Sequence, residues 1–113
     1  MSNIDVLPHT HGLTMCNINI PYSAICSVGK KPFWGTVLIE YKPQDLLLEF
    51  VSVEDFVKSL GTQSIIIEDV AQLVFYEISR ALGDIPLRVS VNARTTVHAP
   101  VYVQKKQGDW KNE

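Results

Sequence analysis

The chain has 113 residues, of which 46% are hydrophobic and 19% charged, with a formal net charge of −2. This length leaves room for one hydrophobic core, so we expect a single domain over residues 1–113. The small negative charge excludes general electrostatic attraction to nucleic acid or to an anionic membrane. Two cysteines make no disulfide framework, and no apolar run could span a bilayer. The first residues lack the basic and apolar regions of a signal peptide, so we expect a cytoplasmic protein with reduced thiols.

Residues 1–11 read as a flexible N-terminal arm. The arm contains His9 and His11, whose spacing suits two metal ligands, but no other histidine or cysteine lies close in the sequence. We therefore expect no metal site.

Two strands are predicted next. Leu13–Ile20 alternates between an apolar face and a more polar one, and Pro21 is expected to end it. Trp34–Tyr41 alternates in the same way. Residues 42–45 are expected to turn, and residues 46–51 to form either a short strand or the entry to a helix.

Two helices follow. Ser52 is a candidate N-cap with Asp55 three residues on, and Gly61 closes the short helix after it. Residues 62–64 are expected to cap a longer helix that Gly83 ends. The expected buried stripe of the first comprises Val53, Phe56, Val57 and Leu60, and that of the second comprises Ile66, Ile67, Val70, Val74, Ile78 and Leu82.

Residues 85–93 and 97–104 are expected to form a hairpin, followed by a frayed polar tail over residues 105–113. Strands and helices in separate blocks predict an α+β fold, an antiparallel four-stranded sheet with two helices between the strand pairs. Because such a sheet has two open edges, we expect copies of the chain to associate through them.

Cys26 is the candidate nucleophile. A thiol reacts as its thiolate, and the positive charges of Lys30 and Lys31 would favour that form. Gly29 and Pro32 mark a turn that could hold the thiol at a pocket mouth. The alternative interpretation is that Cys26 is a small buried apolar residue.

Cys26, Ser27 and Val28, with Pro32 and Thr36 downstream, resemble the Cys-Pro-Val-Thr-Gly-Gln-Pro-Asp-Phe-x-Thr pattern of the QueF family of tunnel-fold enzymes. Three further places align with family motifs over roughly residues 13–104. Residues 49–52 stand where the family has Glu-(Ser/Leu)-Lys-(Ser/Ala), residues 67–68 where it has His-Glu, and residues 94–95 where it has Arg-Gly.

The resemblance implies a tunnel fold, in which several copies of the chain join into a homo-oligomer. Its binding sites lie between subunits and take a purine- or pterin-like ligand. It implies that Cys26 attacks the nitrile of 7-cyano-7-deazaguanine to give a thioimide. Glu68 would anchor the base through two N–H groups. The other substrate-binding positions by this resemblance are Ile67, Glu49 and Phe50, and the cofactor positions are Val51, Ser52, Arg94 and Thr95.

The chain departs from the family at several of these positions. Phe33 replaces the catalytic aspartate that donates a proton, and Ile67 replaces the histidine. Val51 and Glu54 stand where lysines would meet the phosphates of NADPH. NADPH is therefore poorly supported. We expect instead the amidinotransferase type, which makes archaeosine from a nitrile base in tRNA, with Lys30 or Lys31 or a neighbouring subunit replacing the aspartate.

Several alternatives stay open at this point. One is an NADPH-dependent 7-cyano-7-deazaguanine reductase, and another is a non-catalytic tunnel-fold protein that binds a purine or pterin, with Phe33 and Trp34 stacking on it. A pterin enzyme such as type IB GTP cyclohydrolase needs metal ligands, and His98 with the other histidines offers no suitable spacing. The substrate could be a free base, a tRNA or a DNA. Residues 30–31 and 105–106 carry lysines that would form a polyanion path if folding brought them together.

Overall fold

The computed structural model describes residues 4–94 and 99–111. Its elements, in chain order, are β1 (Val6–Pro8), β2 (Cys16–Cys26), β3 (Pro32–Tyr41), β4 (Leu46–Leu48), α1 (Phe50–Ser59), a 3₁₀ turn (Leu60–Thr62), β5 (Ser64–Ile65), α2 (Ile67–Leu82), β6 (Leu87–Ala93) and β7 (Val101–Gln107).

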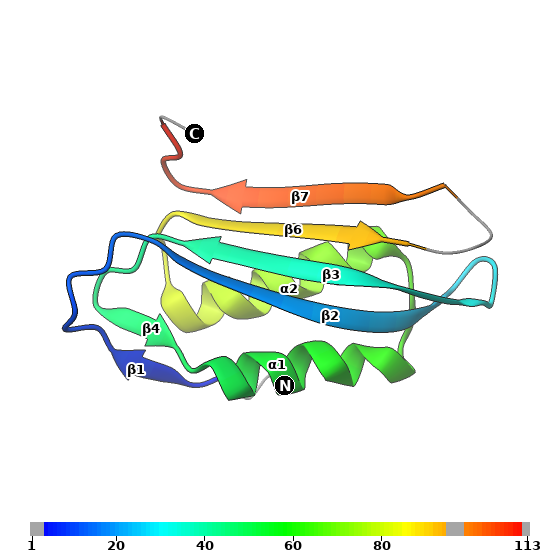
Figure 1. The fold of residues 1–113 in the computed structure, drawn as a ribbon, viewed down its shortest axis with the longest axis horizontal. Coiled ribbons are helices and arrows are strands. Elements are labelled where there is room, and N and C mark those ends of the chain that lie inside the picture. The colour runs from blue at the N-terminus through cyan, green and yellow to red at the C-terminus, as the bar shows by residue number, and fades with distance from the viewer. Residues whose placement is uncertain (1–3, 95–98, 112–113) are drawn as a thin grey trace.

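The main sheet has five strands in the order β5-β2-β3-β6-β7, and β1 and β4 form a separate two-stranded sheet. All pairings are antiparallel except that of β5 with β2, which is parallel. Figure 1 shows both helices on one side of the strands. The α+β class is confirmed. The purely antiparallel four-stranded layout is corrected to a mixed sheet, because the segment between the helices adds β5 beside the end of β2.

The expected face alternation of the strands is confirmed by their burial. The side chains that point toward the helices are almost fully buried, and the helix residues that meet them are buried equally well. Each fully buried aliphatic side chain stabilises the fold by about 1.5–3 kcal/mol. The centre of this core comprises Ile20, Val37, Ile39, Val53, Val57, Val70, Val74, Ile78, Leu87, Val89 and Val91.

The prediction that Pro21 ends the first strand is wrong. β2 continues through Pro21 to Cys26, with Pro21 opposite Thr36. The amide of Ile25 donates away from β3, to the carbonyl of Gln63. Alternation along the strand turns the nitrogen of Pro21 to the same outer side, where no strand of the described residues pairs with it. A proline is tolerated there because its missing N–H lies on the open edge.

The segment expected as a loose arm contains β1, which pairs with β4 through Val6 and Leu48. The amide of Glu49 donates to the carbonyl of Asp5 at 2.9 Å. Val6 is partly buried against the core, so this short segment gains apolar contact as well as backbone hydrogen bonds.

The tail also differs from the frayed segment that was expected. β7 extends to Gln107, and Trp110 folds back with its indole Nε1 donating to the carbonyl of Gln107 at 2.9 Å. The guanidinium of Arg88 lies 4.4 Å from the centroid of the Trp110 ring. Trp110 is 8% exposed, and the ammonium group of Lys42 also lies over its ring, 5.1 Å from the centroid.

Both helix starts differ from the predicted caps. α1 begins at Phe50 because the carboxylate of Glu49 accepts hydrogen bonds from the amides of Val51, at 2.7 Å, and Ser52, at 2.9 Å. α2 begins at Ile67 after residues 62–64 have formed a 3₁₀ turn and β5. Serine, threonine, asparagine and aspartate are the usual caps, so a glutamate in this role is easily missed.

Candidate functional site

Cys26 lies at the end of β2, in the tight hairpin that leads to β3. Its amide donates to the carbonyl of Lys31 and its carbonyl accepts from the amide of Lys30, both at 2.8 Å. Lys30 adopts a left-handed conformation with φ of 59°. The hairpin therefore holds the cysteine backbone in one position at the tip of two strands.

The surroundings of the thiol favour its thiolate. The amide of Gly29 donates to the Cys26 Sγ at 3.4 Å. This bond, a second one from the amide of Val28 and the positive charge of Lys30 lower the pKa of Cys26. A thiol with a lowered pKa that is only partly buried is the kind that reacts as a nucleophile.

The start of α2 lies beside the cysteine in the same chain. Cys26 pairs with Ile65 of β5, and the amide of Ser27 donates to the carbonyl of Ile65 at 3.3 Å. α2 begins two residues later, so its first turn, which contains Glu68, follows directly from the strand that pairs with Cys26. Figure 1 shows the β2–β3 hairpin and the start of α2 at the same end of the molecule. Glu68 is exposed, so its carboxylate is accessible to a ligand.

Phe33, which stands at the position of the family aspartate, belongs to the core. It is 7% exposed, and its ring meets that of Tyr22 edge-on with centroids 6.0 Å apart. Tyr22 donates its hydroxyl hydrogen to the carbonyl of Asn92 at 2.8 Å, and burial raises the pKa of this phenol. Phe33 therefore fills apolar space beside the hairpin and offers no proton.

The remaining predicted substrate positions lie elsewhere. Ile67 is 8% exposed and packs in the core. Glu49 uses its carboxylate to cap α1, and Phe50 next to it is 54% exposed. α1 begins beside β4, at the other end of the molecule from the hairpin (Figure 1). Within one chain, Glu49 and Phe50 are therefore separated from Cys26.

The predicted cofactor positions do not suit the phosphates of NADPH. Val51 is apolar and 52% exposed, and Ser52 donates its hydroxyl hydrogen to the carbonyl of Glu49. Glu54 lies 3.5 Å from Lys58 in an i,i+4 ion pair that leaves an acid where the family has a base. Arg94 is exposed, and Thr95 lies outside the described residues. Dinucleotide phosphates need cations, and Arg94 is the one cation at these positions, so the set as a whole does not fit the cofactor.

No cluster of three or more metal-ligating side chains occurs among residues 4–94 and 99–111. Both ring nitrogens of His9 are occupied, Nδ1 by the carbonyl of Gln44 at 2.7 Å and Nε2 by the amide of Leu13 at 2.9 Å. His9 thus fastens the turn between β1 and β2. His98 lies outside the described residues.

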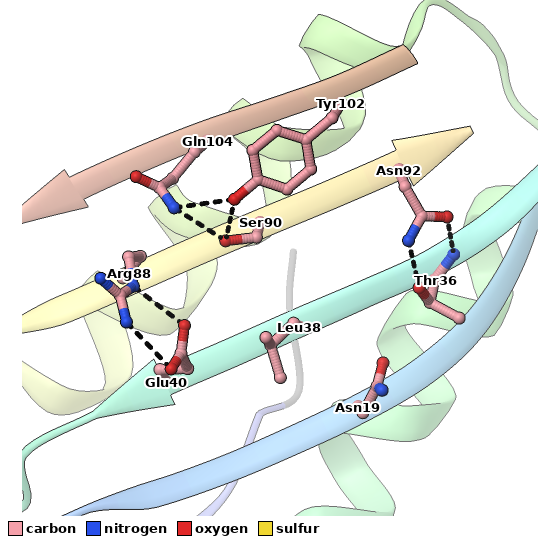
Figure 2. Close-up of a pocket in the computed structure, with 9 residues that line it drawn as sticks. All are labelled: Asn19, Thr36, Leu38, Glu40, Arg88, Ser90, Asn92, Tyr102 and Gln104. Carbon is pink, nitrogen blue, oxygen red and sulfur yellow. Dashed lines mark hydrogen bonds and ion pairs between the residues drawn. The ribbon is translucent and has the colours of Figure 1, made fainter. Parts of the chain in front are cut away.

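The sequence did not indicate a hollow of about 290 Å³ on the open face of the sheet, which Figure 2 shows. The Asn92 side chain joins β6 to β3 there, accepting from the amide of Thr36 at 3.0 Å and donating to the Thr36 hydroxyl at 2.6 Å. Arg88 makes a bidentate ion pair with Glu40 at 2.9 and 3.0 Å. The sequence pattern that could have indicated this hollow is the series of polar residues at alternate positions of these strands.

The four lysines do not form one path. Lys105 and Lys106 of β7 stand opposite Val89 and Arg88 of β6, toward the end of the sheet that carries Trp110. The hairpin with Lys30 and Lys31 lies at the opposite end of β3. Folding therefore does not bring the two lysine pairs together in a single chain, so the condition for a polyanion path is not met.

We compared the chain with known proteins. It is 26% identical over 93 residues to the NADPH-dependent 7-cyano-7-deazaguanine reductase of Wolinella succinogenes, which covers 80% of this chain and 75% of that protein. It is 28% identical over 71 residues to the enzyme of the same name from Frankia casuarinae, which covers 63% of this chain and 57% of that protein. No protein-family model matches.

Among solved structures, the archaeosine synthase QueF-Like in its apo form superposes with a TM-score of 0.79. This superposition covers 86% of the chain and 96% of the other protein, at 18% sequence identity. Sequence and fold together support a QueF-like family. The two sequence relatives share the name 7-cyano-7-deazaguanine reductase, while the structural likeness supports the fold. No helix in the described part of the chain is long and apolar enough to cross a bilayer.

Proposed function

We propose that this QueF-like chain acts on the nitrile of a 7-cyano-7-deazaguanine base through Cys26. The observation that carries the proposal is the placement of the Cys26 thiol, bonded by the Gly29 amide, beside the strand that leads into α2 and Glu68. Both sequence relatives are named for 7-cyano-7-deazaguanine.

The two groups have complementary roles. The Glu68 carboxylate accepts two N–H groups from the edge of the base, which fixes its orientation. The Cys26 thiolate adds to the nitrile carbon, so that a C–S bond forms and the C≡N triple bond becomes C=N. The nitrogen gains a negative charge and must take up one proton, and the product is a covalent thioimide.

We assign the proton source to Lys30. Phe33 is apolar and buried, so the family's donor has no counterpart at its own position. Lys30 lies close enough to act on the Cys26 thiol through its charge. An ammonium group beside the sulfur can first favour the thiolate and then supply the proton that the nitrogen requires.

The second step uses an amine rather than a hydride. Ammonia attacks the thioimide carbon and the C–S bond breaks. The proton that leaves the ammonia nitrogen returns to Lys30, and the products are a neutral amidine and the free thiolate. Val51 and the paired Glu54 leave no cation at the two positions where the family has lysines for dinucleotide phosphates. This supports an amidine-forming reaction without NADPH.

We further propose that the site is completed by a second copy of the chain. Cys26 and Glu68 lie at one end of the molecule, and Glu49 and Phe50 lie at the other. A homo-oligomer that brings these two ends together would form the site between subunits. β7 has an open outer edge for such pairing, and β2 has one along its first residues.

The test is a product analysis. The protein is incubated with 7-cyano-7-deazaguanine and either ammonium or NADPH, and the products are separated and weighed by mass spectrometry. We expect the amidine with ammonium and no oxidation of NADPH. An aminomethyl product with consumption of NADPH would instead make the chain a reductase.

A non-catalytic binding protein is the second candidate, and the burial of Phe33 in place of an acid favours it. Such a protein would bind the base through Glu68 without forming a covalent bond. Binding that Glu68→Ala weakens but that never yields an adduct or product would identify this case.

A further inference from the structure

The hollow on the open face of the sheet is a second place where a ligand can bind (Figure 2). Its floor is one row of side chains that stand opposite one another across four neighbouring strands. The row comprises Asn19 of β2, Leu38 of β3, Ser90 of β6 and Gln104 of β7. Asn19 stands seven residues before Cys26, about 23 Å along an extended strand. The centre of the hollow is therefore separate from the thiol.

The charged groups that line the hollow neutralise each other. Arg88 and Glu40 form a bidentate ion pair with N–O distances of 2.9 and 3.0 Å, and each side chain is 15% exposed. An anionic ligand would have to compete with Glu40 for the guanidinium, and a cationic ligand would have to compete with Arg88 for the carboxylate. The hollow therefore favours a neutral ligand.

The polar groups from β6 and β7 hold one another in place. The side-chain amide of Gln104 donates to the hydroxyl of Ser90 at 3.2 Å and to that of Tyr102 at 2.9 Å. The Tyr102 hydroxyl also donates to Ser90, at 3.2 Å. Ser90 is 6% exposed, and its oxygen accepts twice, so its own hydroxyl hydrogen remains available to donate. The Gln104 side-chain oxygen accepts from no other described side chain or amide, so it remains an available acceptor.

The other side of the hollow adds a further donor and a complete amide. The Thr36 hydroxyl accepts from the Asn92 side chain at 2.6 Å, which leaves its hydrogen available to donate. The exposed Asn19 side chain bonds to no other described residue, as Figure 2 also shows. The hollow thus offers donors and acceptors together, on side chains that mostly have fixed positions.

We infer that this hollow binds a neutral sugar of one or two rings. Each hydroxyl of a sugar both donates and accepts, so one ring can meet the donors Ser90 and Thr36 and the acceptors of Asn19 and Gln104. The strands that supply these four groups span about 14 Å, so the groups surround a ring rather than line one edge of a planar base.

Apolar surface and size agree with this ligand class. Leu38 lies at the centre of the floor, and the Tyr102 ring is 63% exposed above it, so both can contact the C–H groups of a sugar ring. The volume of about 290 Å³ is near the lower end of the range for ligand pockets, as a small ligand requires.

The test is saturation-transfer difference NMR on the full chain with D-ribose, D-glucose or maltose. We expect at least one of these neutral sugars to bind with a millimolar dissociation constant, as suits a small polar ligand. D-glucuronate and D-glucosamine carry the same kind of ring with a negative or a positive charge, and both are expected to bind more weakly than D-glucose. Absence of binding by every neutral sugar, or a preference for either charged ring, would overturn the inference.

A matched pair of variants locates the binding. Asn19→Leu removes an amide that bonds to no described residue, so the melting temperature is expected to stay unchanged while sugar affinity falls about fivefold. Asn17→Leu makes the same change two residues earlier on the same face of β2, opposite Glu40 and outside the hollow, and is expected to keep the affinity. Equal losses in the two variants would place the sugar elsewhere and contradict the inference.

The same titration separates this site from the proposed chemistry. Cys26→Ala is expected to bind the sugar as the wild-type chain does, because the hollow does not include the thiol. A loss of affinity in that variant would refute a separate site. The probes contain no nitrile, so failure of sugar binding would leave the proposed function standing, and failure of adduct formation would leave the sugar site standing.

Discussion

At the scale of single residues, the Cys26 thiol has a distinctive electrostatic environment. The Gly29 and Val28 amides and the Lys30 charge lower its pKa in the folded chain. The thiolate is therefore present at a lower pH in the folded protein than in the unfolded one. We expect the rate of iodoacetamide labelling of Cys26 to reach its plateau at a lower pH in buffer than in urea. Coincident pH profiles would show that the hairpin leaves this thiol unperturbed.

Phe33 shows why the family's acid cannot simply be restored. Phe33→Asp removes a buried ring that contacts Tyr22 and places a carboxyl group in the core. We expect a loss of at least about 3 kcal/mol in the free energy of unfolding, measured by urea titration. Phe33→Leu, the control, keeps the apolar contact and is expected to lose less than about 1.5 kcal/mol. Similar losses in both variants would mean that the core tolerates the acid.

Two glutamates at helix starts are expected to have different roles, Glu49 in the stability of the fold and Glu68 in binding of the base. Glu49 caps α1 through two amides, so Glu49→Ala should cost about 1 kcal/mol of stability. Glu68 is exposed in the first turn of α2, so Glu68→Ala should cost only about 0.3–1 kcal/mol. Calorimetric titration with 7-cyano-7-deazaguanine should show the affinity falling with Glu68→Ala. If the affinity is unchanged in that variant, Glu68 is not the anchor.

At the scale of elements, β3 and β6 approach each other closely at Gly35. A Cβ added there would overlap the carbonyl and side-chain oxygens of Asn92, the same residue that bonds Thr36 and Tyr22. Gly35→Ala is therefore expected to destabilise the fold by about 1–3 kcal/mol in thermal or urea unfolding. In Gly29→Ala the nearest atom to the new Cβ would be the Cys26 Sγ at 3.9 Å, an ordinary contact. An equal loss in both variants would contradict this account of Gly35.

The apolar alternation in residues 13–20, 34–41 and 85–93 predicted the buried face of the sheet correctly, because burial on one side is encoded in a period of two. The helix stripes were equally readable. Caps and edges were not. Glu49 caps α1 through the amides of Val51 and Ser52, a role that glutamate seldom plays, and Pro21 and β5 depend on strand pairing between segments distant in the sequence. The placement of Cys26 beside the start of α2 follows from that same β5 pairing, so periodicity alone could not have shown it.

At the scale of the whole molecule, the predicted site residues are divided between two ends. Glu49 and Phe50 lie by β4, and Cys26 and Glu68 lie by the hairpin. We expect sedimentation equilibrium to show a homo-oligomer. Mixing Cys26→Ala with Phe50→Glu, each inactive alone, is expected to restore part of the activity, because a mixed interface contains one intact pair of ends. A fully active monomer would contradict a shared site.

The central claim is that Cys26 forms a covalent bond to the nitrile carbon. Intact-protein mass spectrometry after incubation with 7-cyano-7-deazaguanine, in the absence of ammonium, measures this directly. We expect a mass increase equal to that of the base in the wild-type chain and in Cys16→Ala, and none in Cys26→Ala. An unchanged wild-type mass at saturating base, or an adduct that persists in Cys26→Ala, would contradict it.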